Sequence, residues 1–154
     1  TLGREANWDT GQIYLTDKPV LVEDEMWFYY GGNKSSHNIP GTSAIGMAKT
    51  KLNRLFGARS LPDTVGRILT RPIKVNGDLF INAESIGAVQ VEVISADNDK
   101  PLDGWRAKDC EPFIGDELNK TICWGNKSLS DLNGTLVRLR FQLKDAVLYS
   151  FDIR

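Results

Sequence analysis

Val137-Arg138-Leu139-Arg140-Phe141-Gln142-Leu143 is the stretch that decides the fold, and Val89-Gln90-Val91-Glu92-Val93 repeats its pattern. Apolar and polar residues alternate in both stretches. Because successive side chains of a β-strand point to opposite faces, each stretch predicts a strand with one buried and one solvated face. After Lys144-Asp145 the alternation resumes at residues 147–153, which predicts a turn and a second antiparallel strand.

Shorter signals extend this pattern through the second half of the chain. Asn76-Gly77-Asp78 separates the apolar residues of 66–75 from those of 79–83, which predicts a hairpin. Residues 118–124 predict a further strand, and no window of helical length carries an apolar stripe at three- and four-residue spacing. Residues 60–154 therefore predict six or seven antiparallel strands in an all-β, two-sheet, jelly-roll-like β-sandwich.

The first 59 residues have a different sequence pattern. An acidic turn at residues 23–25 separates the apolar residues 19–22 from the aromatic run 26–30, which predicts a hairpin. Residues 43–48 are mostly small and predict one more strand in a crowded setting. We therefore expect two regions, a short β-meander over residues 1–59 and the sandwich over residues 60–154.

The composition excludes several classes of protein. The 154 residues include 19 Lys and Arg against 20 Asp and Glu, so the formal net charge of −1 offers no basic surface for nucleic acid. With 41% hydrophobic and 25% charged residues the chain has the composition of a folded soluble domain. No apolar run approaches the ~20 residues that cross a bilayer, so we expect no membrane span.

Two cysteines and four sequons suggest an oxidising, glycosylating compartment. A disulfide between Cys110 and Cys123 would close a 14-residue loop and stabilise the fold by roughly 3 kcal/mol, whereas buried thiols are the alternative. Asn-x-Ser/Thr sequons begin at Asn33, Asn119, Asn126 and Asn133. Together these features predict a secreted protein.

Few residues are candidates for catalysis. His37 is the only histidine, so triads and two-histidine metal sites lack members, and His37 is retained only as a residue of a polar loop that could face a substrate. Glycoside hydrolysis instead needs two carboxyl groups about 5 to 10 Å apart. Asp9 is the candidate carboxylate, because the neighbouring Trp8 gives it an aromatic, pocket-like setting.

Carbohydrate binding and calcium binding are the remaining possibilities in the sequence. Sugar rings stack on exposed indoles, and Trp105, which follows Asp103-Gly104 in a loop-like stretch, is the candidate platform, with Asp103 and Trp8 as further contacts. Trp27 and Trp124 are expected to be packing residues. Loop oxygens could also hold a calcium ion. The acidic residues in question are Asp97, Asp99, Asp103, Asp109, Glu111, Asp116 and Glu117.

A succession of short motifs links the chain to a known group of enzymes. In the first region these are Trp8-Asp9-Thr10-Gly11-Gln12-Ile13-Tyr14, Met26-Trp27-Phe28-Tyr29-Tyr30-Gly31-Gly32, His37 and Gly46-Met47-Ala48. A strand ending in Tyr-Tyr-Gly, a polar loop and a Gly-x-Ala strand, in this order, resemble the final blade of five-bladed β-propeller glycosidases of the family 32 and 43 superfamily. Stretches such as Asp109-Cys110-Glu111-Pro112 and Leu148-Tyr149-Ser150-Phe151 resemble the β-sandwich that follows such propellers.

The resemblance implies a part of a larger sugar-processing protein. Since a five-bladed propeller needs roughly 250 to 300 residues, residues 1–59 correspond to a partial propeller blade, and we expect a fragment or natural truncation with its catalytic carboxylates mainly on earlier blades. The implied function is a non-catalytic module that supports the propeller and binds carbohydrate, with upstream blades as partners. In the alternative, a structural protein, the unpaired strands pair with another copy. A hydrolase acting through Asp9 is the third hypothesis.

Overall fold

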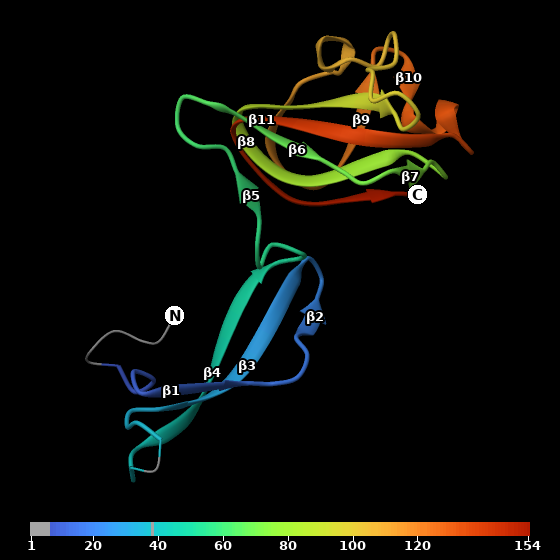
Figure 1. Ribbon diagram of the computed structural model, residues 1–154. Coiled ribbons are helices and arrows are strands. Elements are labelled where there is room, and N and C mark those ends of the chain that lie inside the picture. Colours follow the sequence, from blue (N-terminus) through green and yellow to red (C-terminus); the bar gives the residue numbers. More distant parts are fainter. Residues whose placement is uncertain (1–6, 38) are drawn as a thin grey trace. The chain divides into compact units, whose positions relative to one another are not determined.

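The computed structural model describes residues 7–37 and 39–154 (Figure 1). The chain divides into two compact units, of which the first ends at Leu55 and the second comprises Phe56–Arg154. This division lies close to the expected boundary between residues 59 and 60. Both units consist of antiparallel strands, and the only helical elements in the described residues are the short 3-10 helices η1 (Ala107–Asp109) and η2 (Leu129–Leu132). The all-β prediction is confirmed.

The first unit is one antiparallel sheet built around β3 (Glu25–Asn33). β4 (Ser43–Lys51) pairs with one side of β3 along its whole length. β1 (Gln12–Leu15) and β2 (Val20–Val22) share the other side, with β1 opposite residues 30–33 and β2 opposite residues 25–27. The predicted hairpin between β2 and β3 is present, so this unit is a β-meander.

The second unit is a seven-stranded antiparallel sheet centred on two long strands, β8 (Leu79–Ser95) and β11 (Leu136–Ile153). β9 (Phe113–Trp124) pairs with the other side of β8, and β10 (Lys127–Ser128) pairs with β9. Three short strands pair with the other side of β11. They are β5 (Ala58–Arg59), β6 (Val65–Leu69) and β7 (Ile73–Lys74).

Both long strands bend sharply near their middle, so that the sheet folds over itself (Figure 1). The register between β8 and β11 shifts there, between Lys144 and Ala146, and such bulges bend a strand. Asp145 has a φ of 46°, and a Cβ on Gly87 would lie 2.4 Å from the carbonyl oxygen of Lys144. Only a glycine at position 87 permits this close approach. The two halves of the sheet therefore face each other as layers of a sandwich.

One hydrophobic core lies between the two halves. The inward residues of β8 at positions 79–83 and 89–93 belong to the same buried cluster, which requires the sheet to be folded. The apolar residues predicted to face inward at 89–93 and 137–143 are all buried. The antiparallel β-sandwich prediction is confirmed, with the difference that a single folded sheet supplies both layers.

Two predicted turns are wrong. Lys144-Asp145 does not end a strand, because β11 continues through it as a bulge that moves the inward positions from odd to even numbers, with Ala146 and Leu148 buried. Asn76-Gly77-Asp78 does not join a hairpin either, because β7 and β8 pair with opposite sides of β11. The backbone of Asp78 instead exchanges two hydrogen bonds with Arg154, of 2.9 and 3.1 Å.

Candidate functional site

The sheet of the first unit has no core of its own among its described residues, where no apolar side chain is buried. Cross-strand pairing assigns its exposed side chains to two faces. The Tyr29 face carries Tyr14, Val20, Tyr29, Ile45 and Met47. The opposite Tyr30 face carries exposed Leu15 and Leu21 beside the half-buried Ile13, Phe28 and Tyr30. Both faces therefore carry exposed apolar side chains, although the Tyr29 face also holds the ion pair between Glu25 and Lys49, and a solvated sheet normally has one polar face.

A shallow cleft crosses the Tyr29 face. It measures about 320 Å³ and lies over Gly31, between Tyr14 and Ile45. A Cβ on Gly31 would meet nothing within 4 Å, so the absence of a side chain there leaves the cleft open. Ile45, with 83% of its surface exposed, forms one wall. The cleft is part of an uncovered apolar surface rather than an enclosed pocket.

Trp8, Asp9 and Tyr30 form a cluster on the Tyr30 face. The rings of Trp8 and Tyr30 stack with their centroids 5.7 Å apart and their planes 7° from parallel. The Tyr30 hydroxyl donates a 3.0 Å hydrogen bond to Oδ2 of the buried Asp9, and this bond, together with burial, raises the pKa of Tyr30 above its usual value of 10.0. A Cβ on Gly32 would lie 2.3 Å from the Trp8 ring, so the glycine makes room for the indole.

The two catalytic candidates do not meet in the structure. Asp9 is buried and accepts the hydrogen bond from Tyr30, whereas His37 is exposed in the loop between β3 and β4. No hydrogen bond or ion pair joins them in the described part of the chain. Asp9 thus has a visible structural role, which is to hold the segment before β1 against the sheet.

The expectation that Trp105 is an exposed sugar platform is wrong. Only 6% of its surface is exposed, and its ring packs 5.0 Å from that of Trp124 at an angle of 54°. Lys127 Nζ lies 5.5 Å from the Trp105 ring centroid. Asp103 is exposed, but its carboxylate pairs with Arg106 at 2.7 Å. The preceding Gly104 adopts a φ of 77°, which favours glycine at that position.

Trp124 is a packing residue, as predicted. It is buried, and its Nε1 donates a 2.8 Å hydrogen bond to the carbonyl oxygen of Val91 on β8. The bond ties β9 to β8 from inside the core. The other packing candidate, Trp27, is half-buried on the Tyr29 face and donates a 2.8 Å bond to Glu25 Oε2. That bond and the neighbouring Lys49 lower the pKa of Glu25.

The predicted disulfide is not formed, and the alternative of free thiols describes the structure. Cys110 is buried, and the backbone N–H of Val91 donates to its Sγ over 3.3 Å. Burial raises the pKa of the Cys110 thiol from 9.0 to about 11. Cys123 is only partly buried, and its carbonyl oxygen accepts a 3.0 Å bond from the N–H of Glu111.

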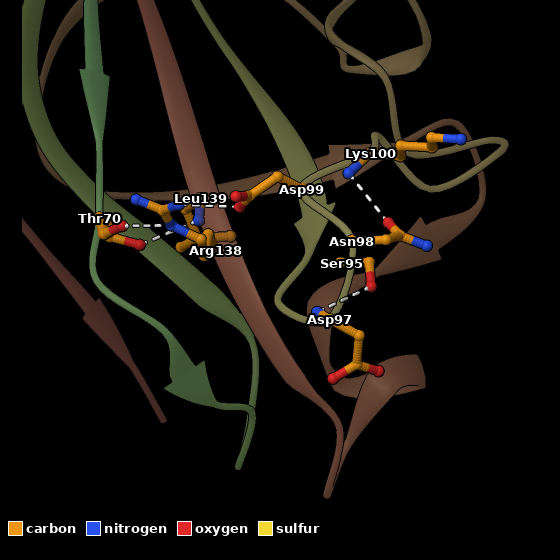
Figure 2. Close-up of polar contacts among 8 residues, drawn as sticks. All are labelled: Thr70, Ser95, Asp97, Asn98, Asp99, Lys100, Arg138 and Leu139. Carbon is orange, nitrogen blue, oxygen red and sulfur yellow. Dashed lines mark hydrogen bonds and ion pairs between the residues drawn. The ribbon is translucent and has the colours of Figure 1, made fainter.

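The acidic loops do not form a calcium site. Figure 2 shows the turn after β8, where Asp99 pairs with Arg138 at 2.8 Å and Arg138 also donates to the carbonyl oxygen of Thr70. Two local hydrogen bonds stabilise the turn itself. The N–H of Asp97 donates to Ser95 Oγ, and the N–H of Lys100 donates to Asn98 Oδ1. Across residues 7–37 and 39–154 no three His, Cys, Asp or Glu side chains gather where they could hold a metal. The possibility of a calcium site built from these acidic side chains is therefore not supported by their arrangement.

The four sequons differ in their surroundings. Asn126 and Asn133 are exposed at turns, and Asn119 is exposed on β9, where it accepts a 2.6 Å bond from Arg154. Asn33 is half-buried at the end of β3 and bonds to Ser43 and Ser35. Glycosylation at these four positions stays a prediction.

One pocket was not anticipated from the sequence. It lies in the second unit where β8 and β11 bulge, measures about 220 Å³, and we call it the bulge pocket. Its walls include Ser60, whose Oγ accepts from the N–H of Ala146 at 3.2 Å, and Ser85. Ser85 is 4% exposed, and its hydroxyl has no hydrogen-bond partner among the described residues. Leaving a buried hydroxyl unpaired costs about 1–3 kcal/mol.

The residues that line the bulge pocket are far apart in the sequence and come together only in the folded sheet. Arg59, Glu84 and Asp145 surround the same pocket from β5, β8 and β11. Glu84 accepts a 3.2 Å bond from the Tyr149 hydroxyl, whereas the side chains of Arg59 and Asp145 make no hydrogen bond or ion pair within the described chain. The sequence signal that could have located the pocket is Gly87 in the interior of a strand, since a glycine there often marks a bulge.

Comparisons with protein-family models, with curated proteins and with solved structures find no match for this chain. The resemblance to propeller glycosidases is therefore still a prediction. Within the described residues no helix is both long and apolar enough to cross a membrane.

Proposed function

We propose that this chain is a non-catalytic module of a secreted glycosidase-like protein. In this proposal the first unit is a blade-like sheet that packs between further β-sheets, and the second unit is the β-sandwich module that supports the propeller. One observation carries the proposal: the described first unit exposes apolar side chains on both faces of its sheet and buries none.

A sheet with apolar side chains on both faces is stable in water only when other residues cover them. Antiparallel sheets with one face packed against a core normally expose polar residues on the other face. Here Ile45 on the Tyr29 face is 83% exposed and Leu21 on the Tyr30 face is 64% exposed. Sheets pack face to face about 10 Å apart, and radially arranged blades offer such a neighbour on each side. The propeller setting therefore accounts for both faces.

Self-assembly through the edge of the sheet is the second candidate. It is favoured by β4, whose nine residues pair only with β3 in the described chain. Lys49 and Lys51 lie on this strand, however, and edge lysines oppose strand addition. Packing through the faces is therefore the better account.

Mass and hydrogen exchange test the proposal on the 154-residue chain. We expect a 17.2 kDa monomer in light scattering, in which the amides of β3 and β4 exchange much faster than those of β8 and β11. A dimer that Ile45→Lys dissociates, while the control Ile114→Lys on β9 does not, would instead indicate pairing with a second copy. A monomer whose amides are equally protected from exchange in both units would overturn the proposal of face packing and the alternative of self-assembly.

A further inference from the structure

We propose that the bulge pocket of the second unit binds one ring of a neutral polyhydroxylated ligand, that is, a saccharide unit. The pocket is bounded by residues of β5, the segment directly after it, β8 and β11, and every residue of its lining belongs to Phe56–Arg154. It is therefore independent of the sheet of the first unit. Trp105 and its indole ring play no part in it.

The polar groups of the pocket are largely uncommitted. Arg59 offers guanidinium donors and Asp145 offers carboxylate acceptors, and neither is paired within the described residues. The buried Ser85 hydroxyl in the wall can both donate and accept, and it also lacks a partner there. Sugar hydroxyls donate and accept at neighbouring ring positions, so they match a set that contains both kinds of group.

The charges of the lining favour a neutral ligand over a charged one. Arg59 is the one cation of the lining, which also contains the two carboxylates Glu84 and Asp145, so the lining carries one net negative charge. An anion would be repelled by this net charge, and an organic cation would leave the donors of Arg59 unused. A neutral polyol uses the donors and the acceptors together.

Size and shape also fit a single ring. The volume of about 220 Å³ is smaller than the roughly 300–1,000 Å³ of sites for drug-sized molecules. Ile86, with 87% of its surface exposed, and Pro62 supply apolar surface at the pocket, against which the C–H groups of a pyranose can lie. We expect one sugar unit to enter and the rest of an oligosaccharide to remain in solvent.

This inference rests on the proposed function only for the choice of saccharides as the polyol. The two can fail separately. Ile45→Lys tests the packing of the first unit and should leave sugar binding unchanged, whereas variants of Ser85 and Arg59 test the pocket and should leave the mass and the exchange pattern unchanged.

Amide NMR shifts of the 154-residue chain provide the test. The neutral probes are the methyl glycosides of glucose, galactose and mannose, and the matched charged probes are glucosamine and glucuronate. We expect a neutral probe to bind with a Kd of about 1 mM, as the modest ligand efficiency of one ring allows. The shifts should be confined to the segments 59–62, 84–87 and 144–147.

Two substitutions decide whether the pocket groups contact the sugar. Ser85→Ala should weaken binding several-fold without lowering the Tm, because the hydroxyl has no partner to lose in the free protein, and Arg59→Gln should weaken it about tenfold. Arg67→Gln on β6 and Ser95→Ala are controls outside the pocket and should leave the affinity for the sugar unchanged. No shift at tenfold higher concentration, tighter binding of a charged probe, or affinity unchanged in both pocket variants would overturn the proposal.

Discussion

The two units are made from the same kind of element but differ in what they bury. Every buried apolar side chain in the described structure lies in the second unit, where the folded sheet encloses them. In the first unit the apolar residues of β3 are consecutive, so they lie on both faces of the sheet, where they are exposed or half-exposed. An apolar run therefore predicts a strand without revealing whether the residues that cover its faces belong to the same chain.

The largest expected effect is on the free energy of unfolding, in a comparison of a core phenylalanine with an exposed one. Phe141→Ala removes a fully buried ring and should lower the free energy of unfolding by about 3–5 kcal/mol. Phe56→Ala removes a ring that is 82% exposed and should change it by less than about 0.5 kcal/mol. Urea denaturation followed by far-UV circular dichroism measures both. Equal losses would mean that Phe56 is covered in solution.

The second contrast uses two tryptophans whose indole N–H groups donate hydrogen bonds of equal length, one to a backbone carbonyl and one to a carboxylate. Trp124→Phe leaves the buried carbonyl of Val91 without its donor and opens a small cavity, so we expect a loss of about 2–3 kcal/mol. Trp27→Phe breaks a bond of the same 2.8 Å length to Glu25, but in a half-exposed setting where water replaces the donor. Its loss should stay below about 1 kcal/mol. A Trp27→Phe loss as large as that of Trp124→Phe would indicate that the Tyr29 face is dry.

The fold could be predicted where side chains on one face were apolar and those on the other were polar. The strands at 89–93 and 137–143 satisfy this condition and are buried as expected. The bend could not be predicted, because it includes the close approach of Gly87 to the carbonyl oxygen of Lys144, and these two residues lie on different strands far apart in the sequence. A bulge and a turn have the same local sequence signal, Lys144-Asp145, so the sequence suggested two short strands instead of one long one.

The third prediction concerns a titratable group that only the second unit buries. The pKa of Cys110 is about 11 in the folded protein, compared with 9.0 for the exposed thiol. Between these pH values the unfolded chain loses the proton and the folded chain keeps it, so stability falls as the pH rises from 9 to 11. The loss should reach about 2 kcal/mol.

Cys110→Ala should remove this part of the pH dependence, and Cys123→Ala should retain it. Thermal unfolding at a series of pH values gives the three slopes. In addition, a thiol-alkylating reagent at neutral pH should label Cys123 in the folded protein and reach Cys110 only after unfolding, because Cys110 is buried. Labelling of Cys110 at the rate of Cys123 would contradict the buried position.

Site residues were harder to predict than strands, because burial decides their role. Trp105 and Asp103 are neighbours in sequence, but one packs against Trp124 and the other pairs with Arg106 at the surface. Asp9 was identified from its neighbour Trp8, and the two do lie together, although the contact that matters is with Tyr30, 21 residues away. The bulge pocket joins residues from three strands, which no local pattern records.

The smallest expected effect is on the titration of Tyr30, and it tests whether the segment before β1 covers the Tyr30 face. The hydrogen bond to Asp9 and burial raise the pKa of Tyr30 above 10.0, since loss of the phenolic proton would set a second negative charge beside the carboxylate. Asp9→Asn removes that charge, so the pKa of Tyr30 should fall. Asp17→Asn, an exposed substitution in the same unit, should leave it unchanged.

Near-UV absorbance of the phenolate, recorded against pH for the three proteins, gives the comparison, and Tyr30→Phe identifies which of the four tyrosines is responsible. If Asp9→Asn leaves the titration where it is, the carboxylate does not reach the Tyr30 hydroxyl in solution. The Tyr30 face would then be as open as the Tyr29 face, and the first unit would need a partner sheet on both sides. A lowered pKa would show that Trp8 and Asp9 cover part of this face, so that the Tyr29 face is the one that most needs a partner.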